Sequence, residues 1–148
     1  MVWGGISLEG RTELVFVGGC SLTSARYVEE ILLEHVLPYA EFVGENFMLM
    51  HDNARPHTAR VVSDFLQTAD IETMAWPACS PDLNPIEHVW DALGRRVRAR
   101  NLNTLQDLRR ALTEEWEGLP QATITNLLNG MGARMEAVIQ ARGGNQRY

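Results

Sequence analysis

The sequence has no lysine, few cysteines and no long apolar run. Its thirteen cationic side chains are all arginine, and its two cysteines, Cys20 and Cys79, do not have metal-ligand spacing. We expect reduced thiols in an intracellular protein, although the sequence leaves a disulfide open. A membrane-spanning helix needs a run of about eighteen apolar residues, which is absent, and no targeting segment is visible. We therefore expect no membrane partner.

The charge distribution limits the nucleic-acid partners. A net charge of −6 argues against a free-standing duplex-binding module, because such binding comes mainly from cations that neutralise phosphates. Arginines outnumber acids only after residue 90. Arginine suits phosphate recognition, but codon bias in the genome also explains the lack of lysine. The 148 residues, 45% of them hydrophobic, suffice for one domain with a single core.

Apolar spacing and turn residues predict the element order ββαβαβα followed by further helices. Pro38 is expected to end or bend the first helix, because proline cannot continue the helical hydrogen bonds. The expected elements are a hairpin formed by residues 1–7 and 13–18, helix 24–43, strand 47–50, helix 58–68, strand 72–76, helix 85–100, and helices 105–118 and 121–141.

Asp52 follows the apolar segment 47–50, which we interpret as a buried strand. Open α/β sheets place their ligand sites at the carboxyl ends of such strands. The flanking residues His51 and Asn53 are also polar. An Asx-type turn that closes the strand explains the same residues without any ligand.

Glu87 lies in the first turn of helix 85–100, where Asn84 is the expected N-cap and Pro85 the first helical residue. Glu87 is therefore also placed to form a capping box with Asn84. On a helical wheel it borders the apolar stripe, on one side with Asp91 and Arg98. Capping and ligand binding both remain open.

Considered together, Asp52 and Glu87 indicate a metal site. Carboxylates are the ligands that Mg²⁺ prefers, and Mg²⁺ keeps waters and substrate phosphate oxygens in its shell. Two such ions, about 3.5–4 Å apart, can activate an attacking oxygen and stabilise a leaving one. Two carboxylates rarely suffice for two ions, so a third acid is expected.

Two long motifs resemble a known family. HDNARPHTA (51–59) and WPACSPDLNPIEHVW (76–90) are similar to the catalytic domain of Tc/mariner-superfamily transposases, which use an Asp-Asp-Glu (DDE) triad. Thirty-four residues separate Asp52 from Glu87, the spacing typical of that branch. The segments VWGGIS (2–7) and ARGGNQRY (141–148) also look like parts of it, so the resemblance covers essentially the whole chain.

The resemblance implies an α/β fold with a ribonuclease-H-like mixed sheet flanked by helices, in a single domain over residues 1–148. It also implies two Mg²⁺ or Mn²⁺ ions, hydrolysis of DNA at transposon ends, and attack of the freed 3′-hydroxyl on target DNA. Asp52 matches the second acid of the triad and Glu87 the third; Asn53 and His57 are implied to lie near the metal, with Asp91 as a neighbour of Glu87. DNA is the implied partner, with a homodimer allowed, and the nucleus is the expected location in a eukaryote.

The first Asp of the triad has no match here, because no acid upstream of Asp52 follows a buried strand. The N-terminal helix-turn-helix region of the family and the central strand that carries this Asp are missing as well. We expect a sheet with a gap, pairing of strands that should not be neighbours, or poor solubility. We also expect the chain to be inactive alone. The alternative function is a non-catalytic remnant that acts, if at all, as an interaction module.

The arginines at the end of helix 85–100 have two interpretations. They interact favourably with the helix dipole at a solvated C-terminus, or they contact DNA phosphates beside the site. The candidates for DNA-backbone contact are Arg95, Arg96 and Arg98, with Arg100 nearby. A metal hydrolase that uses His51, Asp52 and His57 is a further hypothesis, but it leaves the Glu87 motif unexplained.

Overall fold

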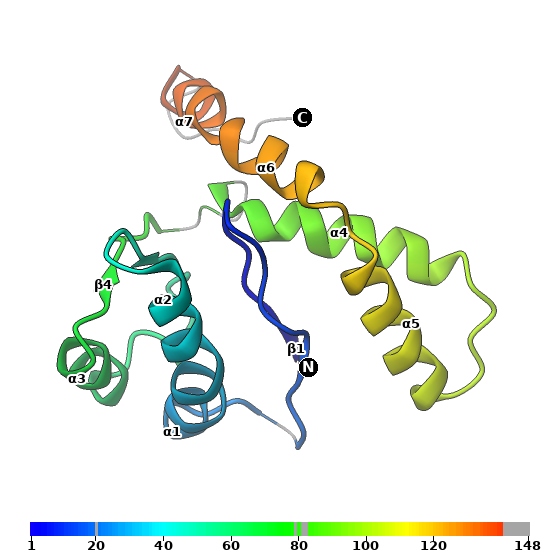
Figure 1. Cartoon of the computed structure of the whole chain (residues 1–148), viewed down its shortest axis with the longest axis horizontal. Coiled ribbons are helices and arrows are strands. Elements are labelled where there is room, and N and C mark those ends of the chain that lie inside the picture. Colours follow the sequence, from blue (N-terminus) through cyan, green and yellow to red (C-terminus); the bar gives the residue numbers. More distant parts are fainter. Residues whose placement is uncertain (20, 79, 81–82, 141–148) are drawn as a thin grey trace. The chain divides into compact units, whose positions relative to one another are not determined.

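The chain forms two compact units (Figure 1), and each is described by itself. The computed structural model describes residues 1–19, 21–78, 80 and 83–140. Unit 1 comprises Met1–Gly5 and Arg11–Cys79, and unit 2 comprises Ile6–Gly10 and Ser80–Tyr148. The single domain expected over residues 1–148 stays a prediction.

Some sequence-based predictions fall outside the described residues. They are the reduced state of Cys20 and Cys79 and the closing segment ARGGNQRY. In the described part of the chain, no helix is long and apolar enough to cross a membrane.

The strands of unit 1 form one antiparallel and one parallel pair. In the predicted hairpin, β1 (Val2–Trp3) is antiparallel to β2 (Val15–Phe16), with Val2 opposite Phe16. The second pair is parallel, β3 (Met48–Leu49) with β4 (Glu72–Thr73). No strand pairing joins the two pairs among the described residues. The sheet is therefore interrupted between the two pairs, which is one of the outcomes expected from the sequence.

The interruption affects β3. The strand expected over residues 47–50 is only two residues long. It was predicted to be buried, and this prediction is wrong. Met48 is 47% exposed and Met50 38% exposed. Among the described strands β3 has a neighbour on one side only, β4, which explains both the short ladder and the exposed methionines.

The first helix of unit 1 is continuous from residue 24 to 43 but changes type along its length (Figure 1). It consists of α1 (Ser24–Arg26), the π-helix η1 (Tyr27–Val36) and α2 (Leu37–Val43). Pro38 does not end it. The proline is the second residue of α2, where the π-helix returns to an α-helix.

The core of unit 1 forms where this helix packs against α3 (Arg60–Thr68). Tyr27, Ile31 and Leu32 point into it and expose 1% or less of their surface. Residues from both strand pairs pack against the same cluster, among them Trp3 and Leu49. The core therefore holds both halves of the interrupted sheet.

The α3 helix differs from its prediction at two points. It begins at Arg60 rather than near residue 58, because residues 55–58 form turns that end at the N-cap Ala59. Apolar spacing over residues 58–68 predicts that Val61, Val62 and Leu66 face inward. Val62 and Leu66 are buried, but Val61 is 48% exposed. In α3 the buried face passes through Val62 and Leu66, one helical turn apart, and Val61 lies beside it.

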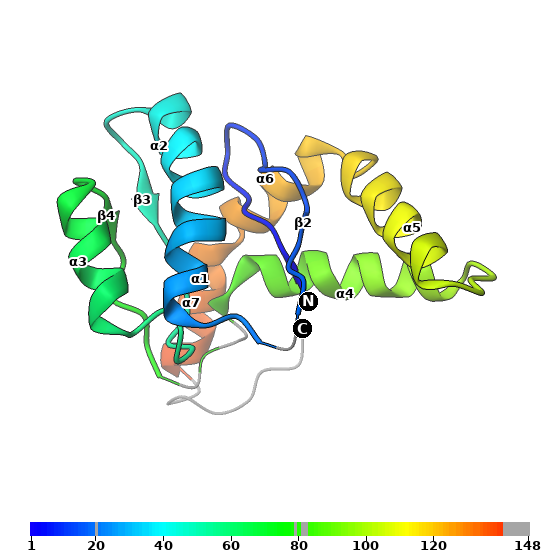
Figure 2. The ribbon, with the colours of Figure 1, turned by 90° about the horizontal axis from the view of Figure 1, so that it is seen from below.

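Unit 2 is helical in its described part (Figure 2). The helix α4 begins where the sequence predicted, with Asn84 as N-cap and Pro85 as first residue. It packs against α5 through Val89, Leu93 and Val97 on α4 and Ala111 and Trp116 on α5, all buried. The helices are α4 (Pro85–Arg98), α5 (Leu105–Glu117), α6 (Gln121–Asn129) and α7 (Met131–Gln140).

The single helix expected over residues 121–141 is divided at Gly130 into α6 and α7. The backbone N–H of Gly130 bonds to the carbonyl of Asn126 as the C-cap of α6. A Cβ at this position would lie 3.3 Å from that oxygen, so the close approach favours glycine. Helical spacing alone does not reveal this cap.

Candidate active site

Asp52 lies in the loop that follows β3, and the two oxygens of its carboxylate have different environments. Oδ1 accepts hydrogen bonds from the backbone N–H of Ala54, at 2.9 Å, and from Nδ1 of His57, at 2.8 Å. The Ala54 bond is the Asx-type turn considered from the sequence. Within the described residues no hydrogen bond uses Oδ2, and the Asp52 side chain is 49% exposed. One oxygen therefore closes the turn, and the other is open to a ligand.

Asn53 fixes the same loop to the segment after β4. Its Nδ2 atom donates to the carbonyl oxygen of Trp76 at 2.9 Å. The β3–β4 ladder continues towards this point, since the N–H of Met74 donates to the carbonyl of Leu49 at 3.0 Å. Asn53 thus has a structural role beside Asp52.

Aromatic rings gather behind Asp52. The ring of His57 lies 4.3 Å from that of Tyr27 and is stacked on His51 at 5.1 Å, centroid to centroid. The hydroxyl of Tyr27 lies 3.3 Å from Nδ1 of His51. In the sequence Tyr27 is one apolar position of the expected helix 24–43, and no local pattern connects it with residues 51–57.

Burial and charge set the ionisation of these rings. Burial and, to a smaller extent, the neighbouring His57 lower the pKa of His51 to about 4, although Asp52 opposes the shift. His51 is therefore neutral near pH 7. Burial raises the pKa of the Tyr27 hydroxyl, with a further contribution from Asp52, so Tyr27 keeps its proton.

A cavity of about 370 Å³ opens beside the two histidines. Its other walls come from the end of α3 and the beginning of β4, with Leu66 and Ile71 as the apolar lining and Asp70 and Glu72 as acids. Solvent and small solutes can therefore reach one side of the histidine pair.

Glu87 lies in unit 2, in the first turn of α4. The N-cap bond of this helix runs from the N–H of Ile86 to the Asn84 side chain, at 3.4 Å. Glu87 does not complete a capping box, and within the described residues no hydrogen bond or ion pair involves its exposed carboxylate. The capping of α4 therefore does not involve the carboxylate of Glu87.

The side of α4 that carries Glu87 also carries Asp91 and Arg98. Asp91 pairs with Arg95 one turn further along. Arg98 folds back over Gly94, where a Cβ would lie 3.8 Å from its Nη2 atom. Arg98 makes no ion pair within the described residues.

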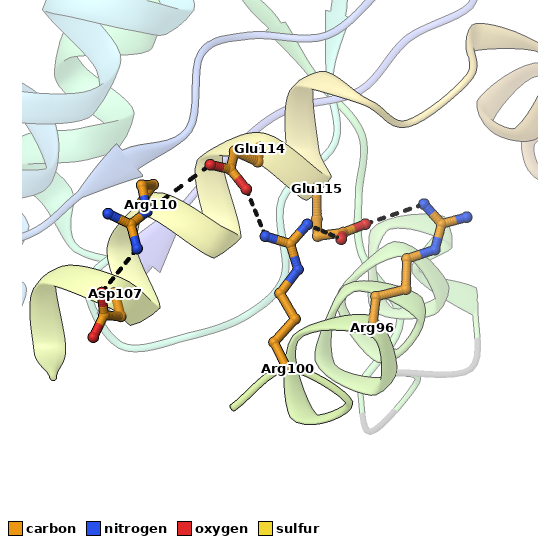
Figure 3. A network of polar contacts seen from close by, with 6 residues as sticks. All are labelled: Arg96, Arg100, Asp107, Arg110, Glu114 and Glu115. Carbon is orange, nitrogen blue, oxygen red and sulfur yellow. Dashed lines mark hydrogen bonds and ion pairs between the residues drawn. The ribbon is translucent and has the colours of Figure 1, made fainter. Parts of the chain in front are cut away.

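Arg96 of α4 and Arg100, which follows α4, bind acids of α5 (Figure 3). Arg100 contacts Glu114 at 2.5 Å and also pairs with Glu115. Arg96 lies 3.5 Å from Glu115. Arg96 therefore connects α4 to α5, and Arg100 connects the segment after α4 to α5, whereas the sequence suggested a solvated helix end or DNA contacts. The signal that could have revealed this is the Glu114-Glu115 pair on the next helix.

Metal-binding capacity can be judged from the donors. In the described part of the chain, no group of three or more His, Cys, Asp or Glu side chains could hold an ion. The open oxygen of Asp52 and the free carboxylate of Glu87 are hard donors of the kind that Mg²⁺ and Mn²⁺ take. The donor chemistry fits such ions.

Comparison with known proteins was made by sequence and by structure. Residues 2–109 match the family described as DDE superfamily endonuclease. The transposable element Tcb1 transposase of Caenorhabditis briggsae is 33% identical over all of this chain and 54% of its own length. The Tc3 transposase of Caenorhabditis elegans is 30% identical over all of this chain and 45% of its own length. The chain thus spans about half the length of these curated relatives.

Solved structures share the fold. The catalytic domain of Mos1 mariner transposase matches 99% of this chain and 74% of that domain, with a TM-score of 0.83 at 22% identity. The same domain with Raltegravir and Mg matches 99% of this chain and 75% of that one, with a TM-score of 0.84 at 22% identity. A Mos1 paired-end complex with the left transposon end matches 99% of this chain and 44% of that one, with a TM-score of 0.83 at 21% identity. The predicted ribonuclease-H-like α/β fold is confirmed.

Proposed function

This chain belongs to the DDE superfamily of endonucleases, and on that premise we propose that it is the catalytic portion of a transposase. In this proposal the complete protein cuts DNA at the ends of its transposon and joins the freed 3′-hydroxyl to target DNA. The observation that carries the proposal is the matched segment itself, residues 2–109, which contains both Asp52 and Glu87.

Asp52 and Glu87 are proposed as metal ligands, the former through Oδ2. Support comes from the separate surroundings of each residue, since each offers an uncommitted oxygen within its own unit. Bound Mg²⁺ or Mn²⁺, two ions in the complete domain, would supply Lewis-acid activation of the attacking oxygen and of the leaving one. Asn53 and His57 hold the loop of Asp52 in place. Asp91 forms an ion pair with Arg95 on α4, the helix that bears Glu87.

A transposase of this kind needs a third carboxylate, and we propose that none of the acids upstream of Asp52 takes that role, because none follows a buried strand. We therefore propose that the chain by itself holds metal weakly and cleaves DNA poorly or not at all. Transposon-end and target DNA are the proposed partners of the complete protein, with a homodimer as its assembly and the nucleus as its location in a eukaryotic host. Relatives solved with Mg and with a transposon end support the choice of metal and partner.

Among the predicted DNA-backbone contacts, the proposal favours Arg98. Arg95 and Arg96 are already paired with acids of unit 2, so that contact with a phosphate would require them to leave Asp91 or Glu115. Arg98 carries no such cost, and it lies on the side of α4 that bears Glu87.

The test is Mn²⁺ binding by the purified chain, measured by electron paramagnetic resonance, together with nicking of supercoiled DNA. We expect Asp52→Ala and Glu87→Ala each to weaken Mn²⁺ binding. Asp64→Ala removes an exposed carboxylate of α3 that pairs with Arg60, and it serves as the matched control. Binding that survives both site substitutions would overturn the proposed metal centre.

The nicking assay addresses the alternative function, a non-catalytic remnant. Nicking that requires Mn²⁺ and disappears in both site variants would support a working catalytic portion. Binding of Mn²⁺ without any nicking, even at high metal concentration, would favour the remnant.

A further inference from the structure

We propose that His57, seated on the buried ring of Tyr27, is a positioning residue that turns Oδ1 of Asp52 inward and leaves Oδ2 as the ligand atom. This inference rests on the proposed function. It concerns the atoms that orient the Asp52 carboxylate, and all the residues involved lie in unit 1.

The first step is the occupancy of Oδ1. This atom accepts from the N–H of Ala54 at 2.9 Å and from Nδ1 of His57 at 2.8 Å. A carboxylate can only accept, so Nδ1 of His57 carries the proton of this bond. Rotation of the carboxylate would break both bonds together. The pair of donors therefore selects one orientation, in which Oδ2 faces away from them.

The second step is the placement of His57 itself. Its backbone N–H donates to the carbonyl of Ala54 at 2.8 Å, and its Nδ1 lies 3.2 Å from the carbonyl oxygen of Asp52. The side chain is only 17% exposed, although it lies in a loop. The turn therefore brings Nδ1 to the carboxylate whenever the loop is folded.

The third step is the support beneath the ring. Tyr27 is the first residue of η1, exposes 1% of its surface, and contacts the His57 ring at 4.3 Å. Thr23 caps the helix just upstream, and Arg26 binds the carbonyl of Gly18 at 2.7 Å, which anchors the start of the helix. A residue fixed in the core thus limits the tilt of the imidazole, and through it the orientation of Asp52. Groups that orient metal ligands commonly change metal affinity by about 10–100-fold.

The geometry specifies the Nδ1 atom, and this allows a matched pair of variants. Asparagine places its amide N–H close to the position of Nδ1, whereas the longer glutamine places it near Nε2. We expect His57→Gln to raise the Mn²⁺ dissociation constant of the full chain about 10-fold. We expect His57→Asn to stay within about 3-fold of the parent, because it keeps a donor to Oδ1. Equal effects of the two substitutions would overturn the proposal, since a general loss of structure does not distinguish these nitrogens.

The role of Tyr27 is tested by Tyr27→Phe and Tyr27→Leu in the same titration. Phenylalanine keeps the ring under His57 and should leave Mn²⁺ affinity unchanged, whereas leucine removes the flat support and should weaken it. Thermal unfolding identifies any variant that fails to fold, in which case the His57 pair decides alone. If Asp52→Ala binds Mn²⁺ like the parent, the proposed function fails. If Asp52→Ala loses binding while His57→Gln retains it, only the positioning role fails.

Discussion

The side-chain amide of Asn53 donates to the carbonyl oxygen of Trp76 at 2.9 Å and thereby joins the loop after β3 to the segment after β4. In a parallel pair of only two residues on each strand, this bond extends the connection beyond the ladder. The residue beside Asp52 thus holds the loop in place from the side of β4.

Asn53→Ala should reduce the free energy of unfolding by about 1 kcal/mol, the usual net value of one such hydrogen bond. Asn53→Asp is a matched control of nearly the same size that cannot donate, so it should be at least as destabilising. Urea titration followed by tryptophan fluorescence measures both. If aspartate proved as stable as asparagine, the bond to Trp76 would not contribute.

Trp90 and Trp116 stack in unit 2, with ring centroids 5.3 Å apart and planes inclined by 17°. Trp116 is buried on α5, and Trp90 is half-buried on α4. Trp90→Ala should cost about 3 kcal/mol of stability through lost burial, and Trp90→Phe clearly less because a ring remains. Denaturant unfolding followed by circular dichroism measures the difference. Equal losses for the two variants would show that the stacking does not matter.

Arg98 and Arg96 should behave differently towards DNA. If Arg98 contacts a phosphate in the complete protein, Arg98→Ala should lower affinity for all DNA sequences alike and reduce the salt slope of binding by about 1. Arg96→Ala should leave that slope unchanged but destabilise the packing of α4 on α5, because Arg96 binds Glu115. Binding isotherms at several salt concentrations, with melting temperatures as a control, separate the two effects. The reverse pattern would assign the DNA contact to Arg96.

Asp107 makes the stability of unit 2 depend on pH. The hydroxyl of Thr104 donates to its carboxylate at 2.8 Å in a capping box, and this bond is the largest cause that lowers the pKa of Asp107, with Arg110 contributing. A group with a lowered folded-state pKa stabilises the fold above its ordinary pKa, and this contribution is lost as the pH falls through the folded value. Asp107→Asn should therefore be less stable than the parent at pH 7, and the difference should shrink below the ordinary aspartate range. A difference that stays constant down to pH 2 would contradict this explanation.

Local signals in the sequence predicted the elements that depend on neighbouring residues. Asn84 and Pro85 correctly marked the start of α4, because N-cap and first-turn preferences involve adjacent positions only. The hairpin of β1 and β2 was likewise recognisable from its turn. The length of the strands could not be predicted, because a strand extends only as far as its partners do. Among the described strands β3 has one partner.

In the candidate site, too, local features could be predicted from the sequence and long-range contacts could not. Asp52 and Glu87 were identifiable from motif and spacing, and their roles as ligands stay predictions. The support of His57 by Tyr27 joins residues thirty positions apart in the sequence, through a π-helix that apolar spacing did not indicate. The pairing of Arg96 and Arg100 with acids of α5 likewise depends on how two helices pack. Long-range contacts of this kind leave no local pattern.

Two exposed methionines, Met48 in β3 and Met50 just after it, have a practical consequence for the purified protein. Met48 and Met50 present their thioethers to solvent, and Met50 is two residues from Asp52. Peroxide converts accessible methionine to the polar sulfoxide. An aged preparation would therefore accumulate damage next to Asp52 before the buried core is affected, and methionine sulfoxide reductase should reverse it. Mass spectrometry of Met48 and Met50 is thus a sensible purity check before any metal titration.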